Sequence, residues 1–252
     1  MEREFTMGTL AVRVYEDRRA LGEAAAADIA RAMEQVLARK PVCNMIFAAA
    51  PSQNETLAAL CRHANLPWNR VHAFHMDEYV GLPADAPQRF GRFLRERLFD
   101  RLPFGAVHLL DGNADPQAEC LRYGRLLQAN PVDIVCMGIG ENGHIAFNDP
   151  PVADFSDPLP VKPVTLEEAC RLQQVHDGCF AALDEVPRQA LTLTIPSLLA
   201  GEALFCMVPA ATKARAVRGT VQGPVSTACP ASILRRHPAA TLYLDRDSGS
   251  LL

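Results

Sequence analysis

Apolar residues along this chain form short runs that alternate with longer amphipathic stretches. The runs predict strands over Leu10–Tyr15, Val42–Ala50, Val71–Met76, Val107–Leu110, Val132–Met137, Ala190–Ile195, Leu204–Val208 and Thr241–Leu244. The stretches between them predict helices over Asp17–Lys40, Leu57–Ala64, Pro87–Asp100, Asp115–Gln128, from Thr165 through His176, Ala210–Arg218 and Ala231–Arg236. We therefore expect an α/β protein with a mostly parallel sheet sandwiched between helices. No linker divides residues 1–252, which indicates a single Rossmann-like domain.

Two segments break this alternation. Pro150 to Pro163 is rich in proline and lacks periodicity, so we expect an irregular surface excursion that is able to act as a lid. Pro51 to Thr56 links a strand to a helix and carries capping side chains. The start of such a helix is suited to phosphate, although an ordinary capped helix has the same pattern.

The glycine-bearing segment Gly138 to Pro150 follows a buried strand and contains the residues best suited to catalysis. His144 lies between Asn142 and Asp149, and a carboxylate on one ring nitrogen fixes the tautomer of a histidine that exchanges protons near neutral pH. A histidine satisfied inside a turn is the alternative. The Gly-x-Gly-x-x-Gly spacing is a weak indication of dinucleotide binding, because prolines follow where a long helix would have to begin.

Asp77 and Glu78 follow the strand Val71–Met76. Neighbouring side chains of an extended chain point in opposite directions, so only one of the two carboxylates enters a pocket. We expect Asp77 to be a general base and Glu78 to be structural, although Asp77 could instead accept hydrogen bonds in a turn. Lys213 begins a helix after a strand, where it is either a phosphate-binding cation or a surface lysine.

Composition narrows the possible partners. The chain has a formal charge of -4 and no run of Lys or Arg, which argues against nucleic acid or an acidic membrane surface and favours a small ligand. It shows no leader pattern and no apolar run long enough to span a bilayer, so we expect a cytoplasmic protein. The eight cysteines include no CxxC pair, which favours buried reduced thiols and gives no support for a metal centre.

Two segments together resemble the signatures of the glucosamine-6-phosphate deaminase (isomerase) family. They are Phe74 to Pro83 and Gly138 to Pro150, and the likeness continues through Val186-Pro187 and Ala190-Leu191-Thr192. The wider superfamily includes 6-phosphogluconolactonases, but Tyr79 and Phe147-Asn148 place the chain on the deaminase side.

The resemblance implies a Rossmann-like fold and an aldose–ketose isomerisation that releases ammonia without a metal or organic cofactor. Asp77 would move a proton between C2 and C1, and His144, oriented by Asn142 and Asp149, would assist ring opening. The implied leading reaction converts glucosamine 6-phosphate and water to fructose 6-phosphate and ammonia. The candidate residues for binding the sugar phosphate are Ser52, Gln53, Thr56, Gly140, Arg171 and Lys213.

The chain also departs from the family pattern. Ser52 to Thr56 replaces a Thr/Ser-Gly-Gly-Thr-Pro loop, and Asn142 and Asp149 replace Asp and Glu. The phosphate-binding arginine expected before Val186-Pro187 has only Arg171 as a nearby match. A lactonase and a non-catalytic sugar-phosphate sensor therefore remain alternatives. The C-terminal extension of allosteric hexameric members is missing, so we do not expect their regulation. We expect a monomer or small homo-oligomer.

Overall fold

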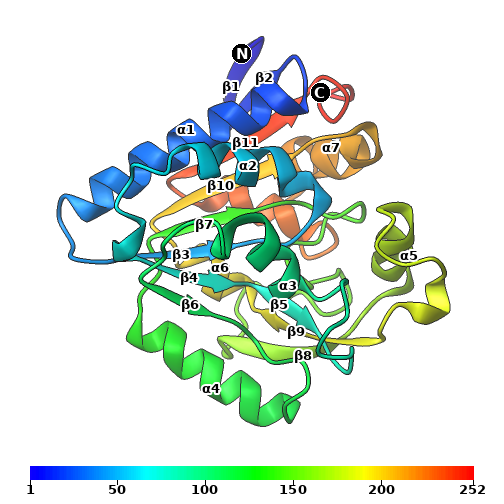
Figure 1. Cartoon of the computed structure of the whole chain (residues 1–252). Helices are drawn as coiled ribbons and strands as arrows, with labels where there is room; N and C mark the ends of the chain where they lie inside the picture. The colour runs from blue at the N-terminus through cyan, green and yellow to red at the C-terminus, as the bar shows by residue number, and fades with distance from the viewer.

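The computed structural model describes residues 1–252 and contains a large and a small β-sheet (Figure 1). The strands of the large sheet are, in spatial order, β1 (Arg3–Met7), β2 (Leu10–Tyr15), β11 (Ala240–Asp245), β10 (Ala203–Val208), β7 (Ile134–Met137), β3 (Cys43–Phe47), β4 (Val71–His75) and β6 (Ala106–His108). Neighbouring strands are parallel except for β1, which pairs antiparallel with β2. The predicted α/β fold with a mainly parallel sheet is confirmed.

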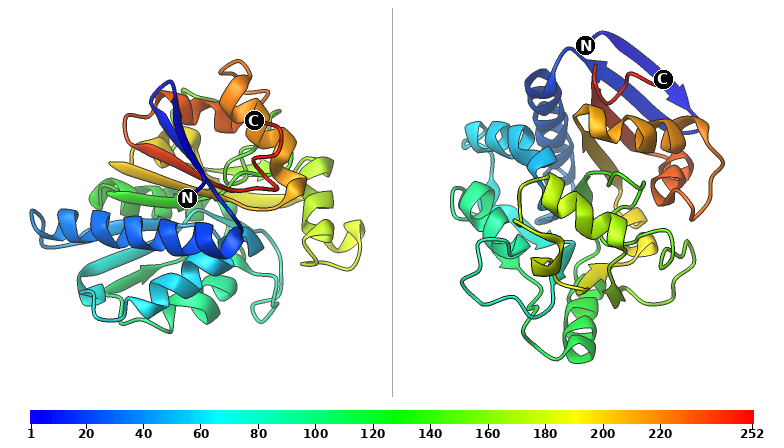
Figure 2. Two further views of the ribbon diagram at one scale, coloured as in Figure 1. Left: turned by 90° about the horizontal axis from the view of Figure 1, so that it is seen from above. Right: turned by 90° about the vertical axis from the view of Figure 1, so that its right-hand side faces the viewer.

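Helices cover both faces of the large sheet (Figure 2). One face carries α1 (Arg18–Leu37), α2 (Asn54–Arg62) and α3 (Phe90–Leu94), and the other carries α4 (Pro116–Ala129), α6 (Ile195–Leu199) and α7 (Ala214–Gln222). In β10, Phe205 and Met207 belong to the first core, whereas Leu204, Cys206 and Val208 belong to the second. Because a parallel strand is buried on both faces, its sequence is continuously apolar, and this is the signal that predicted it.

The small sheet is antiparallel and has the order β5 (Asp77–Tyr79), β9 (Gln189–Leu193), β8 (Val161–Thr165). The sequence predicted loops for β5 and β8, and both predictions are wrong. In particular, the stretch expected to run irregularly to Pro163 becomes a strand at Val161. Proline is accepted there because β8 is an edge strand, where a missing N–H donor breaks no ladder. The end of the supposed lid is therefore part of the scaffold.

Other elements differ from the prediction mainly at their ends. The sequence analysis missed β1 and α6, and α2 begins at Asn54 rather than Leu57, after a 3₁₀ turn over Pro51–Gln53. The helix expected from Pro87 begins at Phe90, and a π-helical turn over Arg95–Phe99 follows it. Helix α5 (Glu168–His176) forms as expected, whereas the last predicted helix is the 3₁₀ segment Pro230–Arg236.

Two compositional expectations bear on the whole chain. None of the helices is both long and apolar enough to cross a membrane. All eight cysteines are free thiols, and five of them are buried.

Candidate active site

One pocket lies where the segments after β3, β4, β7 and β10 meet. Its lining includes Ser52, Asp77, Gly140, His144 and Lys213, each from a different one of these segments except for the pair Gly140 and His144. After β3 the chain builds the sheet towards β6, and after β7 it builds towards β11 on the other side. The pocket therefore lies at the topological switch point, where open α/β sheets bind their ligands.

Asp77 is the first residue of β5 and contributes a buried carboxyl group to the pocket. The residue is 7% exposed, and its carboxyl group has no hydrogen-bond partner in the protein. Burial, followed by the charge of neighbouring Glu78, raises the pKa of Asp77 well above its usual value of 3.8. A carboxylate that is poorly solvated in this way is a stronger base than one in water.

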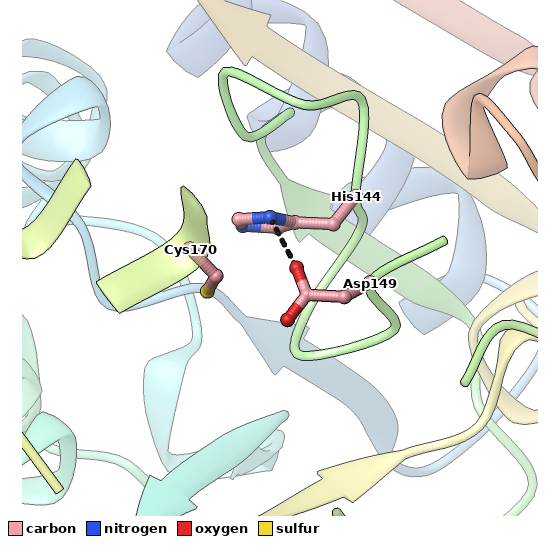
Figure 3. Close-up of side chains that lie close together, drawn as sticks. All are labelled: His144, Asp149 and Cys170. Carbon is pink, nitrogen blue, oxygen red and sulfur yellow. Dashed lines mark ion pairs between the residues drawn. The ribbon is translucent and has the colours of Figure 1, made fainter. Parts of the chain in front are cut away.

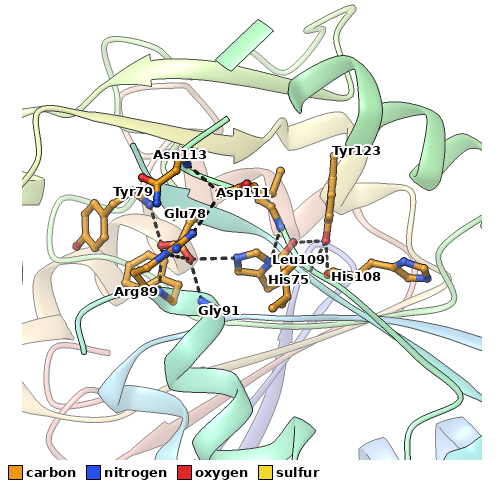
Figure 4. A network of polar contacts seen from close by, with 12 residues as sticks. His75, Glu78, Tyr79, Arg89, Gly91, His108, Leu109, Asp111, Asn113 and Tyr123 are labelled. Carbon is orange, nitrogen blue, oxygen red and sulfur yellow. Dashed lines mark hydrogen bonds and ion pairs between the residues drawn. The ribbon is translucent and has the colours of Figure 1, made fainter. Parts of the chain in front are cut away.

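Glu78 does not line the pocket, and its carboxylate holds the start of α3, as Figure 4 shows for Gly91. Its carboxylate accepts hydrogen bonds from the N–H groups of Phe90 and Gly91, at 3.1 and 3.0 Å. His75 Nε2 and Arg89 Nε lie 3.7 and 3.8 Å from Glu78 Oε2. Burial alone would raise the pKa of Glu78, but these contacts lower it below its ordinary value. The two neighbouring carboxylates thus diverge as predicted, with Glu78 in a structural position.

Gly140 leaves room for the imidazole of His144. A Cβ at position 140 would lie only 2.1 Å from Cε1 of that ring, so no other residue type fits without moving it. Gly140 N–H also donates to the His144 carbonyl at 2.9 Å. The missing side chain at position 140 therefore leaves the space that the imidazole of His144 occupies. This need for space explains the glycine without any dinucleotide-binding role.

Hydrogen bonds behind His144 define its tautomer. Its Nδ1 lies 2.8 Å from Asn142 Oδ1 and 3.0 Å from Asp149 Oδ1, as Figure 3 shows for the carboxylate. Because both neighbours are acceptors, Nδ1 carries the proton and Nε2 is left to exchange protons with a ligand. Burial raises the pKa of Asp149, but contacts with His144 and Asn142 more than offset this and hold it below its ordinary value.

Cys170, from α5, lies against the same pair (Figure 3). The ligand atoms of His144, Asp149 and Cys170 all lie within 4.8 Å of one another, close enough to share a metal ion. Burial, together with the charge of Asp149, raises the pKa of the Cys170 thiol well above its usual value. The thiol therefore keeps its proton at neutral pH in the protein without a bound ion. We interpret the group as hydrogen-bonded support for His144.

Lys213 supplies a buried cation to the pocket. The residue is 5% exposed, and its ammonium makes no hydrogen bond or ion pair within the protein. Burial lowers its pKa, against the opposing charges of Asp177 and Glu141. Ala210, three residues before Lys213, has a φ of 85°, which is strained for a residue with a side chain. The backbone N–H of Ala210 donates a hydrogen bond to the Asp245 carboxylate at 3.0 Å. An unpaired buried ammonium is costly unless an anionic ligand occupies the site.

The remaining candidate residues do not line the pocket. Gln53 donates to the Met207 carbonyl and to Ser52 Oγ, so that it orients Ser52 rather than lining the pocket. Thr56 is buried in α2 away from the pocket, and Arg171 donates to the carbonyls of Leu183 and Val186. Asn142 and Asp149 contact Nδ1 of His144. Five polar residues that line the pocket were not assigned to the site from the sequence: Arg18, Gln173, Gln174, Asp177 and Thr212.

Helix α5 brings three of those polar residues to the pocket. In the right-hand view of Figure 2, α5 lies in front of the large sheet. Gln173 accepts a hydrogen bond from Glu141 N–H at 2.7 Å and donates to Asp177 at 3.2 Å. Their position near the glycine-bearing loop follows from tertiary packing, and the sequence carries no local signal for it.

Comparisons with known proteins match most of the chain. Residues 16–243 match the family model described as glucosamine-6-phosphate isomerases/6-phosphogluconolactonase. A glucosamine-6-phosphate deaminase of Lactobacillus delbrueckii subsp. bulgaricus is 38% identical over 192 residues, which cover 75% of this chain and 79% of the relative. One from Bacillus thuringiensis is 37% identical over 222 residues, covering 87% and 82%.

Solved structures agree with these matches. A monomeric glucosamine-6-phosphate deaminase superposes with a TM-score of 0.88 at 31% identity, covering 96% of this chain and 99% of its own. The 6-phosphogluconolactonase from Thermotoga maritima superposes with a TM-score of 0.76 at 20% identity, covering 94% and 99%. At that identity the second likeness supports the fold alone.

Proposed function

Because the chain belongs to the glucosamine-6-phosphate isomerase/6-phosphogluconolactonase family, we propose that it is an enzyme that converts glucosamine 6-phosphate and water to fructose 6-phosphate and ammonia. Deaminases at 37–38% identity over most of the chain support this reaction over lactone hydrolysis. The observation that carries the proposal is the convergence of Asp77, His144 and Lys213 on one pocket.

Each of the three side chains has one task in this proposal. His144 Nε2 exchanges the proton that opens the sugar ring. Asp77 takes the proton from C2 of the open-chain aldose and returns it to C1, by way of an enolamine. The resulting C2 imine is hydrolysed by water, so that the oxygen of fructose 6-phosphate replaces the nitrogen, which leaves as ammonia.

Lys213 holds the phosphoryl group away from the reacting carbons. An ammonium pairs with phosphate as a point charge, and its burial strengthens that pairing. Ser52 Oγ accepts a hydrogen bond from Gln53 and so keeps its own proton available for a phosphoryl oxygen. The proposal requires neither a metal nor an organic cofactor.

The test is a direct assay of fructose 6-phosphate and ammonia formed from glucosamine 6-phosphate, with 6-phosphogluconolactone as a second substrate. We expect turnover of the amino sugar phosphate and a loss of at least about a hundredfold in His144→Gln, the range that acid–base groups contribute. Turnover of the lactone alone would replace the proposal with the lactonase. Tight binding of sugar phosphate without turnover of either substrate would identify a sensor.

A further inference from the structure

The pocket is lined by a second cation, which comes from an element that the sequence did not point to. Apart from His144, the basic side chains that line the pocket are Lys213 and Arg18. Arg171, the nearest match to the arginine that the resemblance implies, is occupied by the carbonyls of Leu183 and Val186. We propose that Arg18, in the first turn of α1, binds the phosphoryl group together with Lys213 and that Glu55 positions it. This inference rests on the proposed function for the identity of the substrate.

The guanidinium of Arg18 is held from one side and free on the other. Its Nε lies 2.7 Å from Glu55 Oε1, and its Nη2 lies 2.9 Å from both Glu55 Oε2 and the Pro51 carbonyl. Nη1 makes no hydrogen bond within the protein. This leaves one arm of a rigid, always charged fork for a ligand, a geometry that suits phosphate.

The approach of α2 to α1 explains why this pair forms. A Cβ at Gly22 would lie 2.5 Å from Cβ of Glu55, so the two helices are as close as a glycine permits. Figure 1 shows α1 and α2 side by side above the large sheet. Asp17 caps α1 by accepting from Ala20 N–H, which fixes Arg18 at the helix start. Arg18 is thus placed by packing between helices and not by its own loop.

This arrangement also accounts for a carboxylate in a phosphate-binding loop. Glu55 pointing into the pocket would repel a phosphoryl group, but its pairing with Arg18 turns it aside. The pocket is also lined by Gln173, Gln174 and Asp177, which add no positive charge. Arg18 and Lys213 therefore supply the positive charge of the subsite, and Lys213, unpaired and 5% exposed, independently indicates an anionic ligand.

The test compares Arg18→Gln with Arg19→Gln. Arg19 is adjacent on α1, is 82% exposed and pairs with Glu23 on the surface, so its variant is a matched loss of one charge. Binding of inorganic phosphate and of glucose 6-phosphate, which needs no turnover, is measured by calorimetry, and kinetics are measured with glucosamine 6-phosphate. We expect Arg18→Gln to weaken both ligands about tenfold or more, as for one charge-assisted hydrogen bond, and to raise KM more than it lowers kcat.

A second pair of variants separates positioning from folding. Arg18→Lys keeps the charge but loses the fork, and Glu55→Gln keeps the shape but loses the carboxylate, so each should weaken phosphate binding less than Arg18→Gln does. Their melting temperatures show whether the fold is intact. Phosphate binding that is equal in Arg18→Gln and Arg19→Gln would overturn the inference, as would a wild type that binds neither anion.

The two proposals can fail separately. A wild type that does not deaminate glucosamine 6-phosphate, but whose binding of glucose 6-phosphate is weakened by Arg18→Gln, would retain the role of Arg18 and remove the deaminase assignment. An active wild type whose KM is unchanged by Arg18→Gln would keep the deaminase assignment and remove the role of Arg18.

Discussion

At the scale of a single residue, the ionised carboxylate of Asp77 lowers the stability of the folded protein. Its folded-state pKa lies above its unfolded value, so the carboxyl binds a proton more tightly in the native protein than in the unfolded chain. The ionised form that catalysis needs is therefore destabilising, and the cost grows as the pH rises from the unfolded pKa to the folded one.

The first prediction follows from that sign. Asp77→Asn should lose activity by a factor of at least about a hundred, because an amide cannot accept the C2 proton. At neutral pH it should nevertheless be more stable than wild type by about 1 kcal/mol, or roughly 2–4 °C in Tm for a chain of this size. Thermal unfolding at pH 7 and below pH 4 checks this, because the difference should vanish where the carboxyl is protonated in both states.

The pH dependence of wild-type kinetics is a second test of the raised pKa of Asp77. The base must be ionised, so kcat/KM should fall as the pH decreases through the raised pKa of Asp77, well above the usual value of 3.8. A pH–rate profile measures this acid limb. A limb near pH 4 would contradict the burial-raised pKa.

Asn142 illustrates a departure from the family pattern that the structure explains. Its Nδ2 donates to Asp149 Oδ1 at 3.1 Å and to Glu167 Oε2 at 2.9 Å, while its Oδ1 accepts from His144. An amide is thus the group that can bridge two carboxylates and still face an imidazole. The pairing with Glu167 was not evident from the sequence, because it joins residues 25 positions apart.

Asn142→Asp should therefore destabilise the protein by about 2 kcal/mol or more, because it places three carboxylates together. Urea unfolding of this variant, of Glu167→Gln and of the double variant provides the check. We expect Glu167→Gln to restore part of the loss, since a glutamine there can donate to the new aspartate. An Asn142→Asp variant as stable as wild type would contradict the bridging role.

At the scale of elements, the start of α3 depends on Glu78. This carboxylate accepts hydrogen bonds from the first N–H groups of the helix, and Phe90 at that start lines the pocket. Glu78→Ala should lower stability by roughly 3 kcal/mol, the cost of leaving buried partners unpaired, with Glu78→Gln as the milder isosteric control. Because the pKa of Glu78 is lowered in the folded state, the loss should be full at pH 7 and shrink as the pH falls below the usual value of 4.5. Denaturant unfolding at both pH values measures it.

The elements that the sequence predicted are those whose own residues specify them. Strands such as β7 and β10 are continuously apolar, and α1 and α4 have capping aspartates and a periodic face. Strands β5 and β8 were missed because they gain their structure from pairing with β9, far away in the chain. Likewise Asp77, His144 and Lys213 were predicted as candidates from strand ends, whereas Arg18 depends on a contact between two helices.

At the scale of the whole molecule, the reactivity of the cysteine thiols tests whether the native packing is intact. Five cysteines are buried, and burial raises the pKa of Cys43 to about 12 and that of Cys120 to about 11. We expect a thiol reagent at pH 8 to modify native protein only at the three partly exposed cysteines, Cys61, Cys179 and Cys229, because thiolate and access are both required. Counting modified groups in native and urea-unfolded protein checks this, and rapid modification of all eight in the native state would contradict the described packing.

The division into two sheets has a consequence for which sugars fit. Asp77 stands on the small sheet and Lys213 follows β10 of the large one, and Leu193 N–H ties β9 to the carbonyl of Met76 at 2.8 Å, where the sheets meet. The span from Asp77, the proposed base, to Lys213, the proposed phosphate-binding lysine, is therefore fixed by packed scaffold rather than by flexible loops. Because this span is fixed, we expect the protein to select sugar phosphates by the length of their carbon chain. A sugar phosphate one carbon shorter or longer, anchored at Lys213, presents the wrong carbon to Asp77.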